Sequence, residues 1–293
     1  MASEERLNPK TDGERELEAE KRKPELDAAE AKKAEEEESL NESITYEVVR
    51  KEGEKELKRS GSALFWAAIA GGTSMGFSFV TEALLRSHLP DTEWRPLVTK
   101  LGYPVGFLII TLGSQQLFTE NTITPIVPLL VKRTADIFWK VVKLWGIVFI
   151  GNVIGALVFA SLIGWTDSFE PKTHTAFTAI AEDALRGGFP AIFAKGIFAG
   201  WLIALMVWML PAAKSEQIPT VIVMTYLVGI GSFSHIIVGT VEVLYLVVTG
   251  QASPGAAVGG FMAPALLGNV LGGLVFVTAL NHAQTVSGGG RKK

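Results

Sequence analysis

The chain has 293 residues, of which 48% are hydrophobic and 19% are charged, and it contains no cysteine. Disulfide bonds and thiol catalysis are therefore excluded. The sequence has no nucleotide-binding glycine loop, nucleophile elbow or metal-ligand spacing, so we expect neither an ATP-driven pump nor an enzyme. We also expect no cofactor, no bound metal and no nucleic-acid partner.

The N-terminal part is far more polar than the rest of the chain. Residues 1–60 carry 32 of the 57 charged side chains, and the first 40 cannot bury enough apolar surface to fold. We expect residues 1–40 to be a disordered charged arm in the cytoplasm, available to a cytoplasmic partner. Residues 41–60 begin with an N-cap residue, Asn41, and scatter single apolar side chains among charges. This pattern predicts an amphipathic helix on the membrane surface or on the rest of the protein.

Six apolar segments follow, and polar residues interrupt the second near 113–125 and the fifth near 229–240. The intact segments are long enough for a bilayer core of about 30 Å, which takes about 20 helical residues. The sequence thus predicts an all-α membrane protein with a six-helix transmembrane channel domain over 61–285 and a cytoplasmic tail at 286–293. The six segments cover 62–85, 102–131, 144–164, 189–210, 219–248 and 261–281.

The distribution of lysine and arginine indicates the orientation of these segments. Eight such residues lie on one side of the predicted membrane domain and five on the other. The side richer in Lys and Arg is usually cytoplasmic, so we expect both termini in the cytoplasm. The five residues on the opposite side are Arg86, Arg95, Lys100, Lys172 and Arg186.

The most informative stretch is the end of the first interruption, residues 117–125. It is polar, contains Glu120 and ends in a proline. In a bilayer, non-helical backbone is tolerated only where protein buries it or where it lines a water-filled path. An ionisable residue at such a place indicates a functional site. The break therefore predicts a conduit across the membrane.

An internal repeat supplies a partner for this break. Residues 151–160 and 268–277 agree at seven of ten positions, 117 residues apart, and the same offset carries Phe118 onto His235 in the second break. Each half then has three spans, an odd number, so the halves enter the membrane from opposite sides. Inverted repeats with broken helices place a transport path at the repeat interface. Asn152 and Asn269, one in each copy, either pack the helices or bond backbone groups freed by the breaks.

Several of these stretches together resemble the formate/nitrite transporter family. They are Leu117-Phe118-Thr119, Phe233-Ser234-His235, the tryptophan-flanked stretch 201–208 and Gly268-Asn269. The resemblance covers about residues 45–285 and is strongest to a bacterial inner-membrane branch, which implies a multi-pass protein of the bacterial inner (plasma) membrane. It also implies an aquaporin-like protomer with its own pore, assembled as a homopentamer in lipid, that passes small monovalent anions of weak acids.

The resemblance implies roles for individual residues as well. Thr119 would face His235 at the centre of the pore, with Leu117 and Phe118 at a constriction and Asn121, Phe233 and Ser234 beside the path. The chain departs from the family at four positions: Glu120 replaces a small residue, Ser234 an acid, and Gly200 and Gly239 each an asparagine. The family's lysine near the outer start of the fourth segment has no match in register, and Arg186 is the nearest cation.

Three residues leave alternatives open. His235, whose side chain can change charge between about pH 5 and 8, gives a proton to an arriving anion, orients the permeant by hydrogen bonding, or fills the core. Glu120 is neutralised by a partner in the loop, is protonated and donates, or selects ammonium or ammonia. Lys195 reaches the membrane interface, pairs with Glu82 or Glu242, or attracts anions to a vestibule.

The sequence therefore favours a passive or proton-coupled channel for small monovalent weak-acid anions. One alternative is a channel for a neutral or cationic small solute such as ammonia or ammonium, suggested by Glu120 and the missing family cations. A second alternative is a non-conducting membrane anchor whose charged arm binds a cytoplasmic partner. The two breaks argue against the anchor, because broken helices in a membrane are costly unless they are used.

Overall fold

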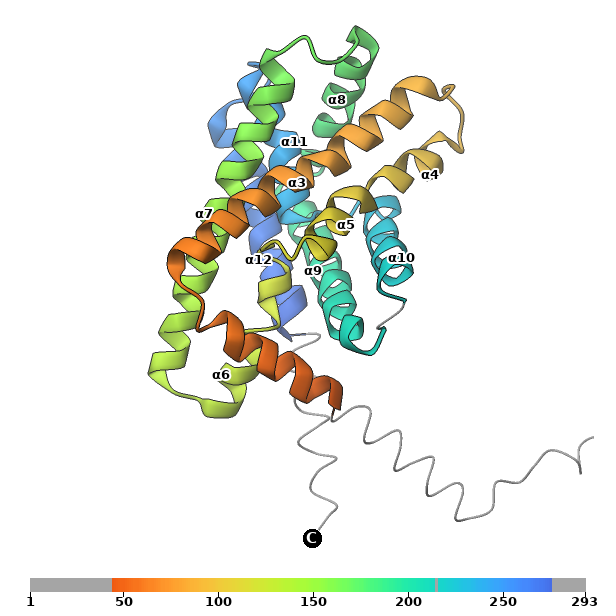
Figure 1. Ribbon diagram of the computed structural model, residues 1–293. Coiled ribbons are helices and arrows are strands. Elements are labelled where there is room, and N and C mark those ends of the chain that lie inside the picture. The colour runs from red at the N-terminus through yellow and green to blue at the C-terminus, as the bar shows by residue number, and fades with distance from the viewer. Residues whose placement is uncertain (1–43, 214–215, 276–293) are drawn as a thin grey trace, which may run out of the picture. The chain divides into compact units, whose positions relative to one another are not determined.

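The structure is a computed structural model that describes residues 44–213 and 216–275 (Figure 1). The predicted arm at 1–40, the end of the sixth predicted segment and the tail at 286–293 lie outside the described residues. The described residues form helices and contain no β-strand. Four helices are long and apolar enough to cross a membrane: α3 (Gly61–His88), α7 (Ala135–Trp165), α9 (Gly188–Ala213) and the continuous stretch Ala256–Gly273. The prediction of an all-helical membrane protein is therefore confirmed.

The remaining helices are shorter, and several are the halves of interrupted segments. Two of them, α10 (Gln217–Ile230) and α11 (Ile236–Val248), are apolar helices of 14 and 13 residues. Residues 44–56 form a further helix before α3. The other elements are α4 (Arg95–Thr99), η1 (Lys100–Gly102), α5 (Pro104–Leu112), η2 (Glu120–Thr122), α6 (Ile126–Lys132), α8 (Pro171–Ala184), α10 (Gln217–Ile230), α11 (Ile236–Val248), the π-helix η4 (Ala256–Met262) and α12 (Ala263–Gly273).

Two helix boundaries differ from the sequence prediction. The helix α7 begins at Ala135 rather than near residue 144, because Thr134 caps it and Lys140 binds Asp136 one turn along at 2.7 Å. The second break is shorter than predicted and covers only residues 231–235. Gly239, which we expected within the break, lies inside α11, where the ring of Phe261 occupies the space that a side chain on Gly239 would fill.

The long helices pack as two close pairs, α3 with α7 and α9 with α12, and glycine makes both approaches possible. A Cβ on Gly72 would lie 2.1 Å from the carbonyl oxygen of Asn152, and a Cβ on Gly200 would lie 2.2 Å from the carbonyl oxygen of Asn269. Small residues at helix crossings let backbones approach closely within a membrane. Gly200, a departure from the family, therefore has a structural reason in this chain.

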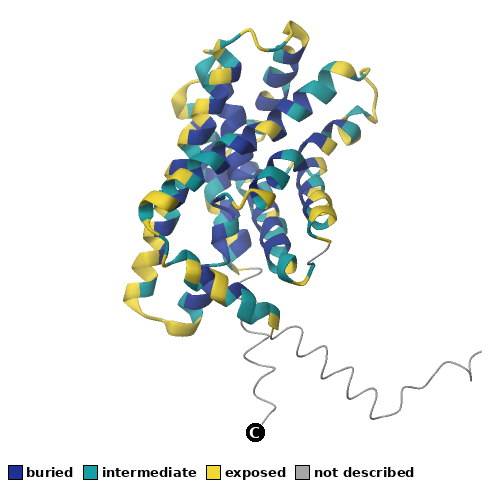
Figure 2. Ribbon diagram, in the orientation of Figure 1, coloured by how far each residue is buried: buried dark blue, intermediate teal, exposed yellow. Residues whose placement is uncertain are grey.

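The interior of this helical unit is apolar, and so is much of its outer surface. Dark blue buried residues run along the inner faces of the helices in Figure 2. Large apolar side chains are exposed on the outside, among them Trp66 at 68% and Leu162 at 56%. Such extensive apolar exposure is typical of a surface that lipid or another protein covers.

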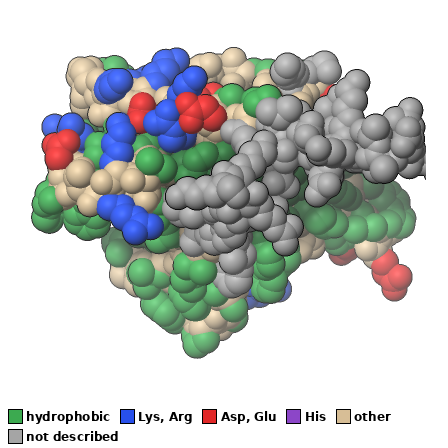
Figure 3. Space-filling view, turned by 90° about the horizontal axis from the view of Figure 1, so that it is seen from below, with side chains coloured by type: hydrophobic (Ala, Val, Ile, Leu, Met, Phe, Trp, Pro, Cys, Tyr) green, Lys and Arg blue, Asp and Glu red, His purple; other side chains and the backbone are tan. Residues whose placement is uncertain are grey.

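The helix at residues 44–56 packs on the first break and on α6. Val49 is fully buried, and a Cβ on Gly53 would clash with the carbonyl oxygen of Thr124. Glu54 binds Lys132 at 2.8 Å, and that amino group lowers the pKa of the Glu54 carboxyl below its ordinary value. Lys and Arg side chains gather on this end of the molecule, seen from below in Figure 3.

Candidate functional site

One asparagine of α7 binds the backbone of the first break. The backbone N–H of Phe118 donates to Oδ1 of Asn152 at 2.9 Å. Nδ2 of the same side chain donates to the carbonyl oxygens of Gln116 at 2.8 Å and Ala68 at 2.7 Å. Asn152 thus satisfies two backbone groups within the break, which no helix satisfies there, and ties the break to α3 through Ala68.

The second break is held in the same way by an asparagine of α12. The backbone N–H of Ile236 donates to Oδ1 of Asn269 at 2.9 Å, and Nδ2 donates to the carbonyl oxygens of Ser234 and Gly196 at 2.8 and 2.9 Å. Both asparagines are fully buried. Of the two alternatives for these residues, the structure has the one in which they bond backbone freed by the breaks.

The matching bonds correct the register that we expected between the two breaks. The bonded positions Gln116 and Phe118 correspond to Ser234 and Ile236, an offset of 118 rather than 117. His235 therefore corresponds to Leu117 and not to Phe118. The physical reason is a difference in length: 34 positions separate Phe118 from its asparagine, whereas 33 separate Ile236 from the second one.

His235 ends the second break and begins α11. Its Nδ1 accepts the N–H of Val238 at 3.3 Å, the N-cap interaction of the helix. Its Nε2 lies 2.8 Å from the hydroxyl oxygen of Thr119 in the first break. Since Nδ1 accepts a hydrogen bond, the proton of a neutral imidazole lies on Nε2 and is donated to Thr119. Phe107 of α5 packs edge-to-face on the imidazole, with ring centroids 5.0 Å apart.

Leu117, Phe118 and Asn121 of the first break are also buried. Leu117 is 0% and Phe118 is 3% exposed. The side-chain amide of Asn121 donates to the carbonyl oxygen of Leu117 at 2.9 Å and to Oε1 of Gln116 at 3.0 Å. The backbone carbonyl oxygen of Asn121 accepts from Nε1 of Trp145 at 2.8 Å. The polar groups of Asn121 thus hold the shape of the break.

Glu120 does not have the partner in the loop that the simplest interpretation requires. Its Oε1 atom is buried and makes no hydrogen bond within the described part of the chain. No ion pair to Glu120 is found among residues 44–213 and 216–275 either. The carboxyl group remains the feature of the first break that its local structure leaves unexplained.

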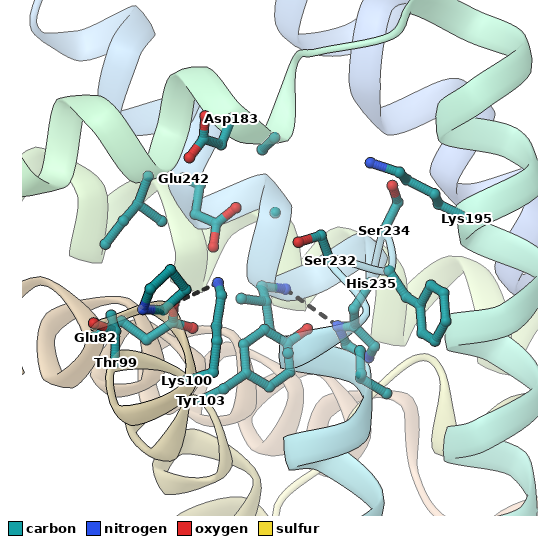
Figure 4. Close-up of a pocket in the computed structure, with 18 of the residues that line it drawn as sticks. Glu82, Thr99, Lys100, Tyr103, Asp183, Lys195, Ser232, Ser234, His235 and Glu242 are labelled. Carbon is teal, nitrogen blue, oxygen red and sulfur yellow. Dashed lines mark hydrogen bonds and ion pairs between the residues drawn. The ribbon is translucent and has the colours of Figure 1, made fainter. Parts of the chain in front are cut away.

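A cavity of about 290 Å³ opens on the side of His235 that faces α8, and we call it the vestibule (Figure 4). Its wall on α11 is formed by one face of the helix, with His235, Gly239 and Glu242 at successive turns. Phe233 and Ser234 of the second break also line it. The charged residues of the wall are Glu82, Arg86, Arg95, Lys100, Asp183, Arg186, Lys195 and Glu242.

Most of these charges are paired. Lys100 binds Glu82 at 2.6 Å, and its amino group lies 5.8 Å from the ring centre of Tyr103. Asp183 accepts from Arg186 at 2.9 Å and lies 3.7 Å from Arg86. Arg95 binds Asp91 at 2.7 Å.

Lys195 differs from these residues, because it makes no ion pair with any described residue. Figure 4 shows its amino group pointing into the vestibule beside Ser234. Of the three alternatives for Lys195, the pairing with Glu82 or Glu242 is not found among the described residues, and Lys100 lies beside Glu82 instead. Arg186, the other predicted cation, also lines the vestibule.

Lys100 and Tyr103 line the vestibule as well, although no motif in the sequence marks them as site residues. Lys100 was counted only as one of five cations that indicate orientation, yet four of those five line the vestibule. Its place directly before an apolar segment, with an aromatic residue three positions later, was the available signal. Within the described residues, no group of three His, Asp or Glu side chains is arranged to hold a metal ion.

Two interrupted helices are joined through buried polar side chains. They lie in a bundle of membrane-length helices, next to the charged vestibule. This arrangement is that of a membrane channel or transporter. Residues 43–283 match the protein family described as Formate/nitrite transporter. The chain belongs to this family, and the resemblance seen in its motifs is confirmed.

Individual relatives agree with the family match. The chain is 40% identical over 239 residues to the inner membrane protein YfdC of Escherichia coli, covering 82% of this chain and 77% of the relative. The fold is similar to a pentameric formate channel with formate bound, with a TM-score of 0.65 and 22% identity over 78% of this chain and 99% of that one. It is also similar to an FNT family ion channel, with a TM-score of 0.74 and 16% identity over 83% and 99% of the two chains. The relatives are channels or transporters rather than enzymes.

Proposed function

We propose that this protein is a channel for small monovalent weak-acid anions such as formate or nitrite, with a pore in each protomer. The observation that carries the proposal is the vestibule, which is lined by both Lys195 and His235 and in which Lys195 has no ion pair with any residue that the structure describes. A cation without a partner attracts anions, and low-dielectric walls strengthen this attraction. The Thr119–His235 pair then lies where the permeant leaves the vestibule.

The two breaks support a path with six spans arranged as an inverted repeat. The hydrogen bonds of Asn152 and Asn269 follow one pattern, with one accepted and two donated bonds at each break. Repeats of this kind place a transport path between their broken helices. Leu117 and Phe118 are buried at the meeting point, which fits a closed apolar constriction.

An apolar constriction also determines the form in which the permeant crosses. An ion that leaves water for an apolar surrounding loses many kcal/mol of hydration, whereas the neutral acid does not. We therefore infer proton-coupled passage, in which the anion gains a proton before the constriction. Both His235 nitrogens are bonded within the protein, so we infer that this residue orients the permeant by exchanging its bond to Thr119 for a bond to the permeant, and not by giving up a proton.

Two relatives support a proposal for the assembly and the location. A relative with the same fold is described as a pentameric formate channel, and another relative as an inner membrane protein. We propose a homopentamer in the bacterial inner membrane, with both termini in the cytoplasm. The exposed apolar side chains of the outer surface then contact lipid and neighbouring protomers.

A second candidate function is a channel for ammonia or ammonium, and the unpartnered carboxyl oxygen of Glu120 favours it. Purified protein in proteoliposomes distinguishes the two candidates through flux of formate, nitrite, hydrosulfide and ammonium at several pH values. We expect weak-acid flux that rises as the external pH falls, and no ammonium flux above that of empty vesicles. Ammonium flux without formate flux would refute the first candidate.

The anchor hypothesis is tested by deleting residues 1–40. Conduction by the shortened protein in the same vesicles supports a channel, because the described helices then suffice for flux. A full-length protein that conducts none of the four solutes would favour the anchor.

A further inference from the structure

One lysine and two carboxyl groups lie together in the vestibule, apart from the Thr119–His235 pair. Lys100 binds Glu82 directly, and Glu242 reaches into the same cavity from α11 (Figure 4). Glu242 is only 7% exposed, and it makes no hydrogen bond or ion pair with any described residue. The fold thus aims a buried carboxyl group into the vestibule and leaves it without a partner.

The Glu242 carboxyl group lacks a counter-charge among the described residues. Lys100 has one positive charge, and the direct ion pair commits it to Glu82. A buried carboxylate without a counter-charge is costly, whereas one bound proton makes these three side chains neutral together. The titratable and charged groups that line the cavity around Glu242 are Glu82 and Arg86 from α3, Arg95 from α4, Lys100 of η1 and Tyr103 after it, Asp183 from α8, Arg186 after α8, Lys195 from α9 and His235 at the start of α11.

None of the surrounding groups is as well placed to give up a proton. Asp183 is held as a carboxylate between Arg86 and Arg186. The Nε2 proton of His235 is donated to Thr119, and its Nδ1 accepts from the backbone. Lysine, arginine and tyrosine keep their protons near neutral pH. Glu242 is therefore the remaining candidate for a proton donor. It lies seven residues, or two helical turns, after His235 on the same face of α11, which is about 10 Å along the helix axis.

We propose that Glu242 is the proton donor of the vestibule, which protonates the arriving anion before it reaches His235. This inference rests on the proposed function. In the transfer, the O–H bond of the Glu242 carboxylic acid breaks and an O–H bond forms on the weak-acid anion. The products are the neutral acid and the Glu242 carboxylate, and no electrons are exchanged. Water at the outer mouth, beside Arg86 and Arg186, returns a proton to Glu242.

Glu242→Gln tests the proposal, because it keeps the size and polarity of the side chain but cannot donate a carboxylic proton. Formate influx into proteoliposomes is recorded together with internal pH from a trapped dye. We expect influx to fall about 100-fold, the lower end of what a positioned general acid contributes, with partial recovery in Glu242→Asp. The wild-type protein should carry one proton with each formate.

Two controls make the result decisive. Glu182→Gln removes an exposed carboxyl of the neighbouring helix α8 and should leave flux unchanged. The thermal unfolding of Glu242→Gln in detergent should match that of the wild type, so that lost flux is not lost folding. Unchanged or increased influx in Glu242→Gln would overturn the inference while the proposed function stands. A wild-type protein that conducts no weak acid would instead overturn the proposed function, and this inference with it.

Discussion

The Nε2 atom of His235 lies 2.8 Å from the hydroxyl oxygen of Thr119, and this single hydrogen bond joins the two helix breaks. The residues are 116 positions apart in the chain, and both are 1% exposed. Their bond therefore connects the second break, where His235 lines the vestibule, to the first break.

Thr119→Val should destabilise the protein, because it leaves the buried N–H of His235 without an acceptor. An unsatisfied buried donor costs about 1–3 kcal/mol. Thermal unfolding of the purified protein in detergent measures this loss. Thr119→Ser keeps the hydroxyl group and should remain near the wild type. Equal stability of the Val and Ser variants would show that the bond does not form in the native protein.

Asn152 and Asn269 should be equally sensitive to substitution, because each makes two hydrogen bonds to the backbone at a break and a third to a carbonyl oxygen of a neighbouring long helix. Asn152→Leu and Asn269→Leu each remove one accepted and two donated bonds, and we expect losses of about 2–4 kcal/mol, since single bonds contribute about 1 kcal/mol. Asn→Asp at either position keeps the acceptor oxygen but removes the donor. It should therefore also destabilise, which chemical denaturation can test. A large effect at one asparagine only would contradict the equivalence of the breaks.

Much of this architecture is visible in the sequence. The long apolar runs predict α3, α7 and α9, and the polar run containing Glu120 predicts the first break. The repeat around Asn152 and Asn269 marks the two helices that hold the breaks. These features are local, or they repeat at a fixed offset, so a single sequence can display them.

The vestibule is harder to predict, because its wall is assembled from distant segments. Glu82 and Lys100 are 18 positions apart, and Glu242 comes from the other half of the chain. Their proximity depends on how α3, η1 and α11 pack, which hydropathy does not encode. The one-residue change of register between the breaks likewise depends on the length of the connection to each asparagine.

Lys195→Gln should slow the entry of anions, because Lys195 is the vestibule cation without an ion pair among the described residues. Electrostatic steering changes association rates by about tenfold or more, and added salt screens it. We therefore expect formate influx at low ionic strength to fall several-fold, with a smaller difference at high salt.

Lys195→Arg keeps the positive charge and should retain formate influx. Lys172→Gln, at an exposed lysine paired with Glu170 outside the vestibule, serves as the control, and an equal loss there would point to a general surface effect.

Packing of the helix at 44–56 should be insensitive to pH until the medium is strongly acidic. Lys132 lowers the pKa of Glu54, so the ion pair stabilises the packed helix above the ordinary glutamate pKa of about 4.3. This contribution is lost only as the pH falls through the lower, native pKa.

The chain has no cysteine, so a fluorophore on a cysteine introduced at the exposed Lys51 reports mobility of the helix through its anisotropy. We expect constant anisotropy from pH 7 down to about 5, and a loss in Lys132→Gln. Release of the helix near pH 6 would show that another group controls it.

Glu120→Gln should increase the flux of anions through the first break. A carboxylate about 4 Å from a permeating anion opposes it by about 4 kcal/mol at an effective dielectric near 20, and the amide removes that charge at nearly constant size. Formate influx measured beside ammonium influx gives the direction of the effect. If Glu120 instead selects a cation, the substitution should abolish ammonium flux and leave formate flux unchanged.

Glu52→Gln, on the exposed side of the helix at 44–56, removes a nearby charge outside the break and should not reproduce the increase. Anion flux that stays constant in Glu120→Gln would mean that this carboxyl carries no charge while an anion passes, so the barrier lies with the apolar side chains of Leu117 and Phe118.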